Sequence, residues 1–185
     1  MMNPLEFICR SPTFKKKLEE MRPRLYKVAY SWCHAADIAD DLVQDTIIKA
    51  MRHSQSLRDM NKMHSWLFSI MANCWRDYLR SQKPTDDIDE CTFTDDSTPE
   101  LTQERQNITD IVQKAVASLP QGQRQVLSLV DLEGFSYAEV ADIMKIPAGT
   151  VMSRLNRARK ALAEQLLELK EQNILTQDTQ IRAVK

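Results

Sequence analysis

The segment of residues 135–162 constrains the fold of this chain more than any other; it reads FSYAEVADIMKIPAGTVMSRLNRARKAL. Ser136 can cap a helix, and Glu139, three residues later, can reach back to complete a capping box. Pro147 cannot continue that helix but suits the first turn of another one. The turn is therefore confined to about residues 145–148, and two helices must dock at close range. The segment predicts a helix-turn-helix.

The second helix of this motif has one apolar stripe and one polar face. Val151, Leu155 and Ala158 recur on one side at helical spacing. Arg, Asn and Ser on the other side have the chemistry to bind base edges and phosphates in the major groove, whereas a merely solvated basic helix is the alternative. The candidate DNA contacts are Thr150, Met152, Ser153, Arg154, Asn156, Arg157 and Lys160.

Length and hydropathy limit the class of protein. The 185 residues can form one or two small domains. No apolar run approaches the roughly 20 residues of a membrane-spanning helix, and no signal segment precedes the Lys15-Lys16-Lys17 run. We therefore expect a soluble cytoplasmic protein.

Residues that could hold a metal or perform catalysis are scattered. Cysteines stand at positions 9, 33, 74 and 91 without a C-x-x-C pair, and the three histidines add no ligand spacing. We expect reduced, mostly buried thiols rather than disulfides or a zinc site. There is also no glycine-rich phosphate loop and no catalytic constellation. The sequence predicts a protein that is not an enzyme and has no metal, cofactor or small-molecule substrate.

Charge is unevenly distributed along the chain. Residues 1–83 carry 14 Lys and Arg against 9 Asp and Glu, residues 84–118 carry 2 against 9, and residues 119–185 carry 9 against 8. The most acidic stretch, residues 84–104, has eight carboxylates, no basic residue and little periodicity, which favours a flexible linker.

The rest of the chain has helical periodicity and no convincing alternation of apolar and polar residues. The predicted fold is all-α, with two small helical domains joined by an acidic linker.

A predicted helix over residues 37–52 places an apolar residue on its polar face. Ala39, Leu42 and Ile47 belong to its core face. Ile48 lies on the opposite face among carboxylates and an amide, which is a hint of a protein partner, although single exposed apolar residues are common. That opposite face comprises Asp41, Gln44, Asp45, Ile48 and Arg52.

The predicted helix over residues 65–80 is rich in aromatic residues. Leu67, Met71 and Cys74 belong to its core stripe, and Phe68 and Trp75 are also expected in the core. A second face combines an aromatic ring, an amide and arginines, which suits unstacked bases. Residues 54–64 before it are expected to form an exposed loop able to contact DNA.

Two parts of the chain resemble one known family. Residues 119–162, which contain the string GTVMSRLNRAR, are similar to region 4 of the extracytoplasmic function (ECF) group of bacterial sigma factors. DIADDLVQDT and SWLFSIMAN upstream resemble regions 2.1 to 2.4 of that group. The resemblance implies an N-terminal extension (1–12), region 2 (13–83), a linker (84–106), region 4 (107–168) and a C-terminal tail (169–185).

The resemblance also implies a function and partners. Members of this group bind core RNA polymerase and direct it to promoters. The helix with Ile48 would bind the clamp helices of the largest polymerase subunit, region 4 would meet the flap of the second-largest, and residues 150–160 would read the minus-thirty-five element. An anti-sigma factor, possibly membrane-bound, would regulate the protein. The resemblance assigns the minus-ten element to Leu57, Arg58, Lys62, His64, Trp66, Asn73, Arg76 and Arg80.

Two other functions are compatible with parts of the sequence. A helix-turn-helix regulator could act without being a polymerase subunit, but the upstream motifs would then have no role. An all-helical adaptor could use the same exposed surfaces for proteins only.

Overall fold

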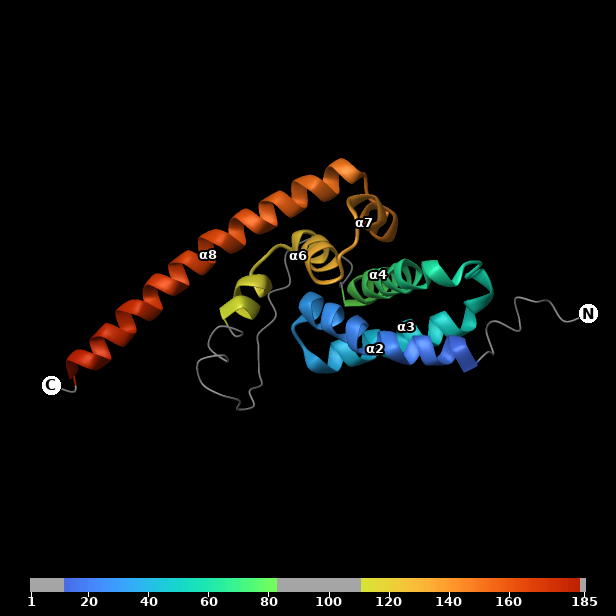
Figure 1. Ribbon diagram of the computed structural model, residues 1–185, viewed down its shortest axis with the longest axis horizontal. Helices are drawn as coiled ribbons and strands as arrows, with labels where there is room; N and C mark the ends of the chain where they lie inside the picture. Colours follow the sequence, from blue (N-terminus) through green and yellow to red (C-terminus); the bar gives the residue numbers. More distant parts are fainter. Residues whose placement is uncertain (1–11, 83–110, 184–185) are drawn as a thin grey trace, which may run out of the picture.

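The computed structural model describes residues 12–82 and 111–183 (Figure 1), and within these ranges it has no β-strand. The prediction of an all-α fold is confirmed. The elements of the N-terminal unit are α2 (Pro12–Cys33), α3 (Ala36–Arg52), the short 3₁₀ turns η1 (Ser54–Ser56) and η2 (Met60–Lys62), and α4 (Met63–Gln82). Those of the C-terminal unit are a helical stretch at residues 111–117, α6 (Gln121–Leu127), the π-helical turn η3 (Ser128–Leu132), α7 (Tyr137–Met144) and α8 (Ala148–Ala183).

The helices of the N-terminal unit form because each has one apolar stripe that the others cover. The expected core residues Ala39, Leu42 and Ile47 of α3 are buried, as are Phe68 and Trp75 of α4. Removing such side chains from water is the main favourable contribution to folding, and for a Leu, Ile or Phe side chain it is worth about 1.5–3 kcal/mol. Packing of α2 and α4 against α3 is therefore dictated by the positions of these apolar residues.

The helix-turn-helix of the C-terminal unit has the capping and turn that the sequence predicts. The Ser136 hydroxyl accepts from the Glu139 backbone N–H, and the Glu139 carboxylate accepts from the Ser136 N–H at 2.9 Å. At the other end of α7, Lys145 adopts left-handed backbone angles, with φ of 56°. That conformation ends α7 and turns the chain so that α8 can begin at Ala148.

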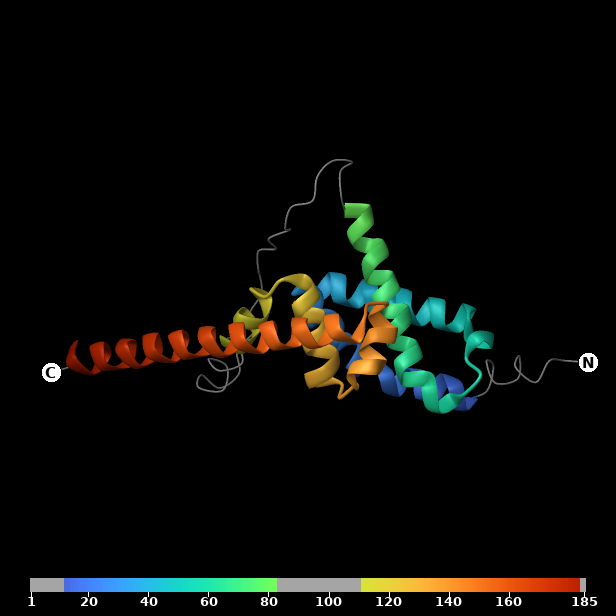
Figure 2. The same cartoon turned by 90° about the horizontal axis from the view of Figure 1, so that it is seen from above.

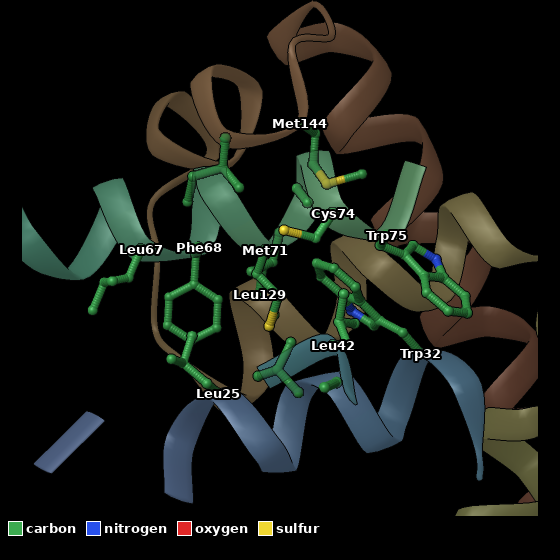
Figure 3. Close-up of a cluster of buried hydrophobic side chains, with 14 of the residues drawn as sticks. Leu25, Trp32, Leu42, Leu67, Phe68, Met71, Cys74, Trp75, Leu129 and Met144 are labelled. Atoms are coloured by element: carbon green, nitrogen blue, oxygen red, sulfur yellow. The ribbon is translucent and has the colours of Figure 1, made fainter. Parts of the chain in front are cut away.

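The two units pack against each other, with α7 and α6 lying over α4 and α2 (Figures 1 and 2). Their buried apolar residues form one continuous cluster. In Figure 3, Leu25 and Trp32 of α2, Met71 of α4, Leu129 of η3 and Met144 of α7 converge on the same interior. The sequence predicted two domains separated by an acidic linker and gave no sign of this packing. The difference arises because α4 and α7 each have an apolar face left over, which they bury against each other.

One expectation about an irregular segment needs correction. Residues 54–64 were expected to form an exposed loop, but they contain η1 and η2, and Leu57 and Ser54 are buried. The Asp59 carboxylate caps η2 by accepting from the Asn61 N–H at 2.9 Å, so the segment has local order of its own. The C-terminal tail, for which a frayed helix was the only expectation, continues α8 as helix to Ala183. The predicted acidic linker and the N-terminal extension up to residue 11 lie outside the described residues.

Candidate nucleic-acid interface

The N-terminal third of α8 presents most of the predicted DNA contacts to solvent. Met152, Ser153, Asn156, Arg157 and Lys160 are exposed, whereas Val151, Leu155 and Ala158 on the opposite side are buried against α6 and α7. Thr150 is half-buried, and its backbone carbonyl accepts from the Ser153 hydroxyl at 3.1 Å. The polar face of a major-groove helix is thus available, while its apolar face fixes the helix to the domain.

Arg154 differs from the other candidate contacts of α8. Its side chain is half-buried and lies over Gly122 of α6. A Cβ built on Gly122 would come within 2.9 Å of the Arg154 Nη1 atom. Because Gly122 has no side chain, the Arg154 guanidinium can lie close to the backbone of α6.

A second arginine connects α8 to the turn that precedes the helix-turn-helix. Arg159 donates from Nε to the Asp131 carboxylate of η3 at 3.2 Å and from a second nitrogen to the other carboxylate oxygen. This two-pronged hydrogen bond raises the pKa of Arg159. It also restrains the direction of α8 relative to η3.

The predicted minus-ten residues lie at the start of α4 and along its outer side. Arg58, Lys62 and Arg80 are exposed, whereas Trp66, Asn73 and Arg76 are half-buried. The Trp66 indole N–H donates to the Ser56 hydroxyl at 3.1 Å, which ties η1 to α4. Arg76 donates to the Asn73 side-chain oxygen, so these two candidates hold each other in place.

Two of the predicted minus-ten residues are not available as the sequence suggested. The Leu57 side chain is 3% exposed and belongs to the core, so it supports the segment rather than presenting a surface. His64 faces the C-terminal unit: its ring stacks on Phe135 with centroids 4.3 Å apart, and its Nε2 atom lies 2.9 Å from a Glu133 carboxylate oxygen. In this arrangement His64 is occupied by contacts within the chain.

The candidate protein-binding face of α3 is open. Asp41, Gln44, Asp45 and Arg52 are exposed, and Ile48 is 38% exposed. Sequence reasoning missed Met51, which is 50% exposed and lies three residues after Ile48. The i to i+3 spacing of these two apolar residues was the signal that could have revealed it.

Sequence reasoning also missed the polar contacts that join the two units. Glu133 accepts from Arg24 of α2 and lies against His64 of α4. In the sequence, Glu133 lies 109 residues from Arg24 and 69 residues from His64. No local pattern could have revealed these pairings.

Neither a cluster placed to hold a metal nor a membrane-spanning helix occurs within residues 12–82 and 111–183. No group of three or more His, Cys, Asp or Glu residues is placed to hold a metal ion. No helix there has both the length and the apolar character that crossing a membrane requires.

Comparisons with known protein families match both units. Residues 18–85 match the family described as sigma-70 region 2, and residues 109–162 match the family described as sigma-70, region 4. The two matches fall on the N-terminal and the C-terminal units respectively.

Two curated relatives span most of the chain. The ECF RNA polymerase sigma factor EcfG of Rhodopseudomonas palustris is 37% identical over 143 residues, covering 76% of this chain and 78% of the relative. The ECF RNA polymerase sigma-E factor of Escherichia coli K12 is 35% identical over 134 residues, covering 66% and 70%.

Two solved structures are similar in fold. The first is the sigma factor RpoE in complex with the anti-sigma factor NepR from Bartonella quintana, with a TM-score of 0.69, 30% identity and coverage of 84% of this chain and 98% of the other. The second is CnrH in complex with the cytosolic domain of CnrY, with a TM-score of 0.59, 25% identity and coverage of 83% and 86%. Together with the curated relatives, these matches show that the chain belongs to the ECF group of RNA polymerase sigma factors and is an alternative sigma factor.

Proposed function

We propose that this sigma factor binds core RNA polymerase through α3 and directs it to promoters read by α4 and α8. The observation that carries the proposal is the presence of both sigma-70 regions in one chain whose relatives span most of its length. The polymerase surface would comprise Asp41, Gln44, Asp45, Ile48 and Arg52, which bind the clamp helices of the largest subunit, while region 4 meets the flap of the second-largest. Met51 adds apolar area beside Ile48.

The division of the DNA contacts follows from the chemistry of the two faces. Arg157 and Asn156 of α8 can each make two hydrogen bonds to a base edge in duplex DNA, which suits the minus-thirty-five element. Trp66, Asn73 and Arg76 of α4 offer a ring, an amide and a cation, which suit the unstacked bases of an opened minus-ten element. Unstacking costs a few kcal/mol per base, and such contacts can offset it.

The remaining parts of the proposal concern partners and chemistry. One similar solved structure is a sigma factor in complex with an anti-sigma factor, and the other is CnrH in complex with the cytosolic domain of CnrY. The first of these supports an anti-sigma factor as a partner of this chain. The chain would act where the polymerase acts, in the cytoplasm. Polymerase would perform all bond chemistry, so the sigma factor itself needs no catalytic group, metal or cofactor.

Transcription in vitro tests this proposal. Core polymerase loaded with the chain should start RNA at defined sites on genomic DNA, whereas core polymerase alone should not. Specific binding of the chain to an operator without polymerase would favour an independent regulator instead. If no activity of the chain depended on DNA, an adaptor that binds proteins only would be favoured.

A further inference from the structure

We infer that Met152 reads the 5-methyl group of a thymine in the major groove of the promoter element bound by α8. The inference rests on the proposed function, because it concerns one side chain of the proposed DNA-reading face. It goes beyond that function by naming the chemical group that this side chain recognises.

Met152 is a large apolar side chain on the outward face of the N-terminal third of α8. It is 56% exposed, whereas Val151 and Leu155 beside it are buried in the core. Among residues 148–160, all of which the structure describes, no other large apolar side chain is exposed. Ser153 and Asn156 lie next to it on the same outward face. A flexible methionine therefore stands among hydrogen-bonding side chains, in the part of a recognition helix that meets base edges.

The first turn of α8 leaves open space in front of Met152. Gly149 lies three residues earlier on the same face. A Cβ built on Gly149 would meet no atom of the chain within 4 Å, and its backbone lies outside the left-handed region, so the fold itself does not require glycine there. Glycine is also less favourable than alanine in a helix. A missing side chain at this position suits a close approach to a partner, which would then reach Met152.

One base edge in the major groove offers an apolar group to such a side chain. Adenine, guanine and cytosine present hydrogen-bond donors and acceptors there, whereas thymine also presents a methyl group. The Met152 thioether has no donor and is only a weak acceptor, so it cannot satisfy polar base edges. Contact with a thymine methyl removes apolar surface of both partners from water. Met152 therefore favours thymine at the position it meets.

The spacing along α8 places this thymine relative to the base that Asn156 reads. Met152 and Asn156 are one helical turn apart, which is about 6 Å along the helix axis at about 1.5 Å per residue. Successive bases of one strand are about 3.4 Å apart along the duplex. The thymine should therefore lie within about two base pairs of the base that Asn156 reads.

Selection of bound sequences locates the thymine. Core polymerase loaded with the full wild-type chain enriches binding sites from random duplex DNA, and the selection is repeated with Asn156→Ala. The position that loses its base preference in Asn156→Ala marks the base read by Asn156. We expect a recurring thymine within about two base pairs of it. The absence of such a thymine would overturn the inference.

Replacing each thymine of this element by deoxyuracil tests the methyl group directly, because deoxyuracil lacks only that group and pairs in the same way. Competition binding measures the affinity of the wild-type holoenzyme for each duplex. At the thymine near the Asn156 position, we expect affinity to fall about three- to fivefold, the size expected for one buried methyl group. Unchanged affinity for every substituted duplex would overturn the inference.

Met152→Ala shows whether Met152 is the residue that meets the methyl group. Its holoenzyme should bind the thymine duplex about three- to fivefold more weakly than wild type. Deoxyuracil should then cause no further loss, because the contact is already absent. An equal loss on deoxyuracil in wild type and Met152→Ala would assign the methyl group to another residue and overturn the inference.

Leu167→Ala is the matched control for Met152→Ala. Leu167 is also apolar, exposed and on α8, but it lies about 22 Å further along the helix. This variant should bind the thymine duplex as wild type does and keep the full response to deoxyuracil. Circular dichroism should show unchanged helix content in both variants, because both side chains are exposed.

Failure of the proposed function would give a different result. The wild-type holoenzyme would then enrich no sequence and start no RNA, and the inference would fall with the function. A holoenzyme that starts RNA at a defined promoter but does not respond to the loss of any thymine methyl group would overturn the role of Met152 alone.

Discussion

The indole N–H of Trp32 in α2 donates to the hydroxyl of Ser128 in η3 at 2.7 Å, and both side chains are buried. This hydrogen bond crosses the interface between the two helical units. Ser128 also donates to the Gln125 carbonyl at 3.0 Å, so its hydroxyl both donates and accepts. The bond fixes the orientation of a large ring in the shared core.

Ser128→Ala should therefore destabilise the protein by about 1–3 kcal/mol, because the Trp32 N–H would stay buried without its acceptor. Urea unfolding followed by circular dichroism measures the change. Ser81→Ala is the control, since the exposed Ser81 hydroxyl donates to the nearby Tyr78 carbonyl of the same helix, and we expect a change within about 0.5 kcal/mol. Equal stabilities for the two variants would contradict a role for the bond between the units.

The capping box of α7 predicts a pH dependence of stability. Hydrogen bonds from the Ser136 side chain and backbone lower the pKa of Glu139. The pKa of Glu139 is lower in the folded chain than in the unfolded chain, so the ionised carboxylate stabilises the fold. This stabilisation is complete above the ordinary glutamate pKa of about 4.3 and is lost as the pH falls through the folded pKa. Ser136→Ala should cost about 1 kcal/mol near pH 7, and its difference from wild type should shrink as the pH falls below about 4. Unfolding at several pH values measures this, and a constant difference would contradict it.

The local features of this fold could be predicted from the sequence because their causes are local. The capping box of Ser136 and Glu139 depends on residues three apart, and the exposure of Ile48 follows from helical periodicity. The prominent apolar stripes of α3 and α4 likewise identified the core. In each of these cases the physical cause lies within one or two turns of a helix.

The relative placement of the two units could not be predicted in this way. Glu133 pairs with Arg24 and His64 through tertiary packing, and nothing near any of the three specifies the others. Leu57 also shows the limit: it lies in a short polar segment without periodicity, so no local pattern predicts its burial in the core. The partial burial of Arg154 likewise depends on Gly122, in another helix.

The exposed face of α3 predicts a selective loss of polymerase binding. Ile48→Asp places a charge at the centre of the proposed interface, and Asp45→Lys reverses one of its charges. Both residues are exposed, so the free energy of unfolding should change by less than about 0.5 kcal/mol. Affinity for core polymerase, measured by biolayer interferometry, should fall at least tenfold. Glu20→Lys, at an exposed position of α2, is the control. Unchanged affinity in the α3 variants would exclude α3 from the interface.

The outward position of Arg157 predicts a loss of DNA affinity without a loss of stability. Arg157→Ala should weaken holoenzyme binding to promoter DNA by about 1–3 kcal/mol, the range for a base contact with two hydrogen bonds. Its side chain is exposed, so unfolding should be unaffected. Filter binding at fixed salt measures the affinity. A variant that binds as tightly as wild type would remove Arg157 from the DNA surface.

The contact between Gly122 and Arg154 predicts coupling between two helices. Gly122→Ala would bring a methyl group within 2.9 Å of the Arg154 guanidinium, which must then move, while α6 gains up to about 1 kcal/mol in helix propensity. We expect a protein of equal or greater stability that binds promoter DNA more weakly. In an Arg154→Ala background, Gly122→Ala should have no further effect on DNA affinity, because the guanidinium it displaces is absent. Additive losses in this double-mutant cycle would show that Gly122 influences DNA binding by another route.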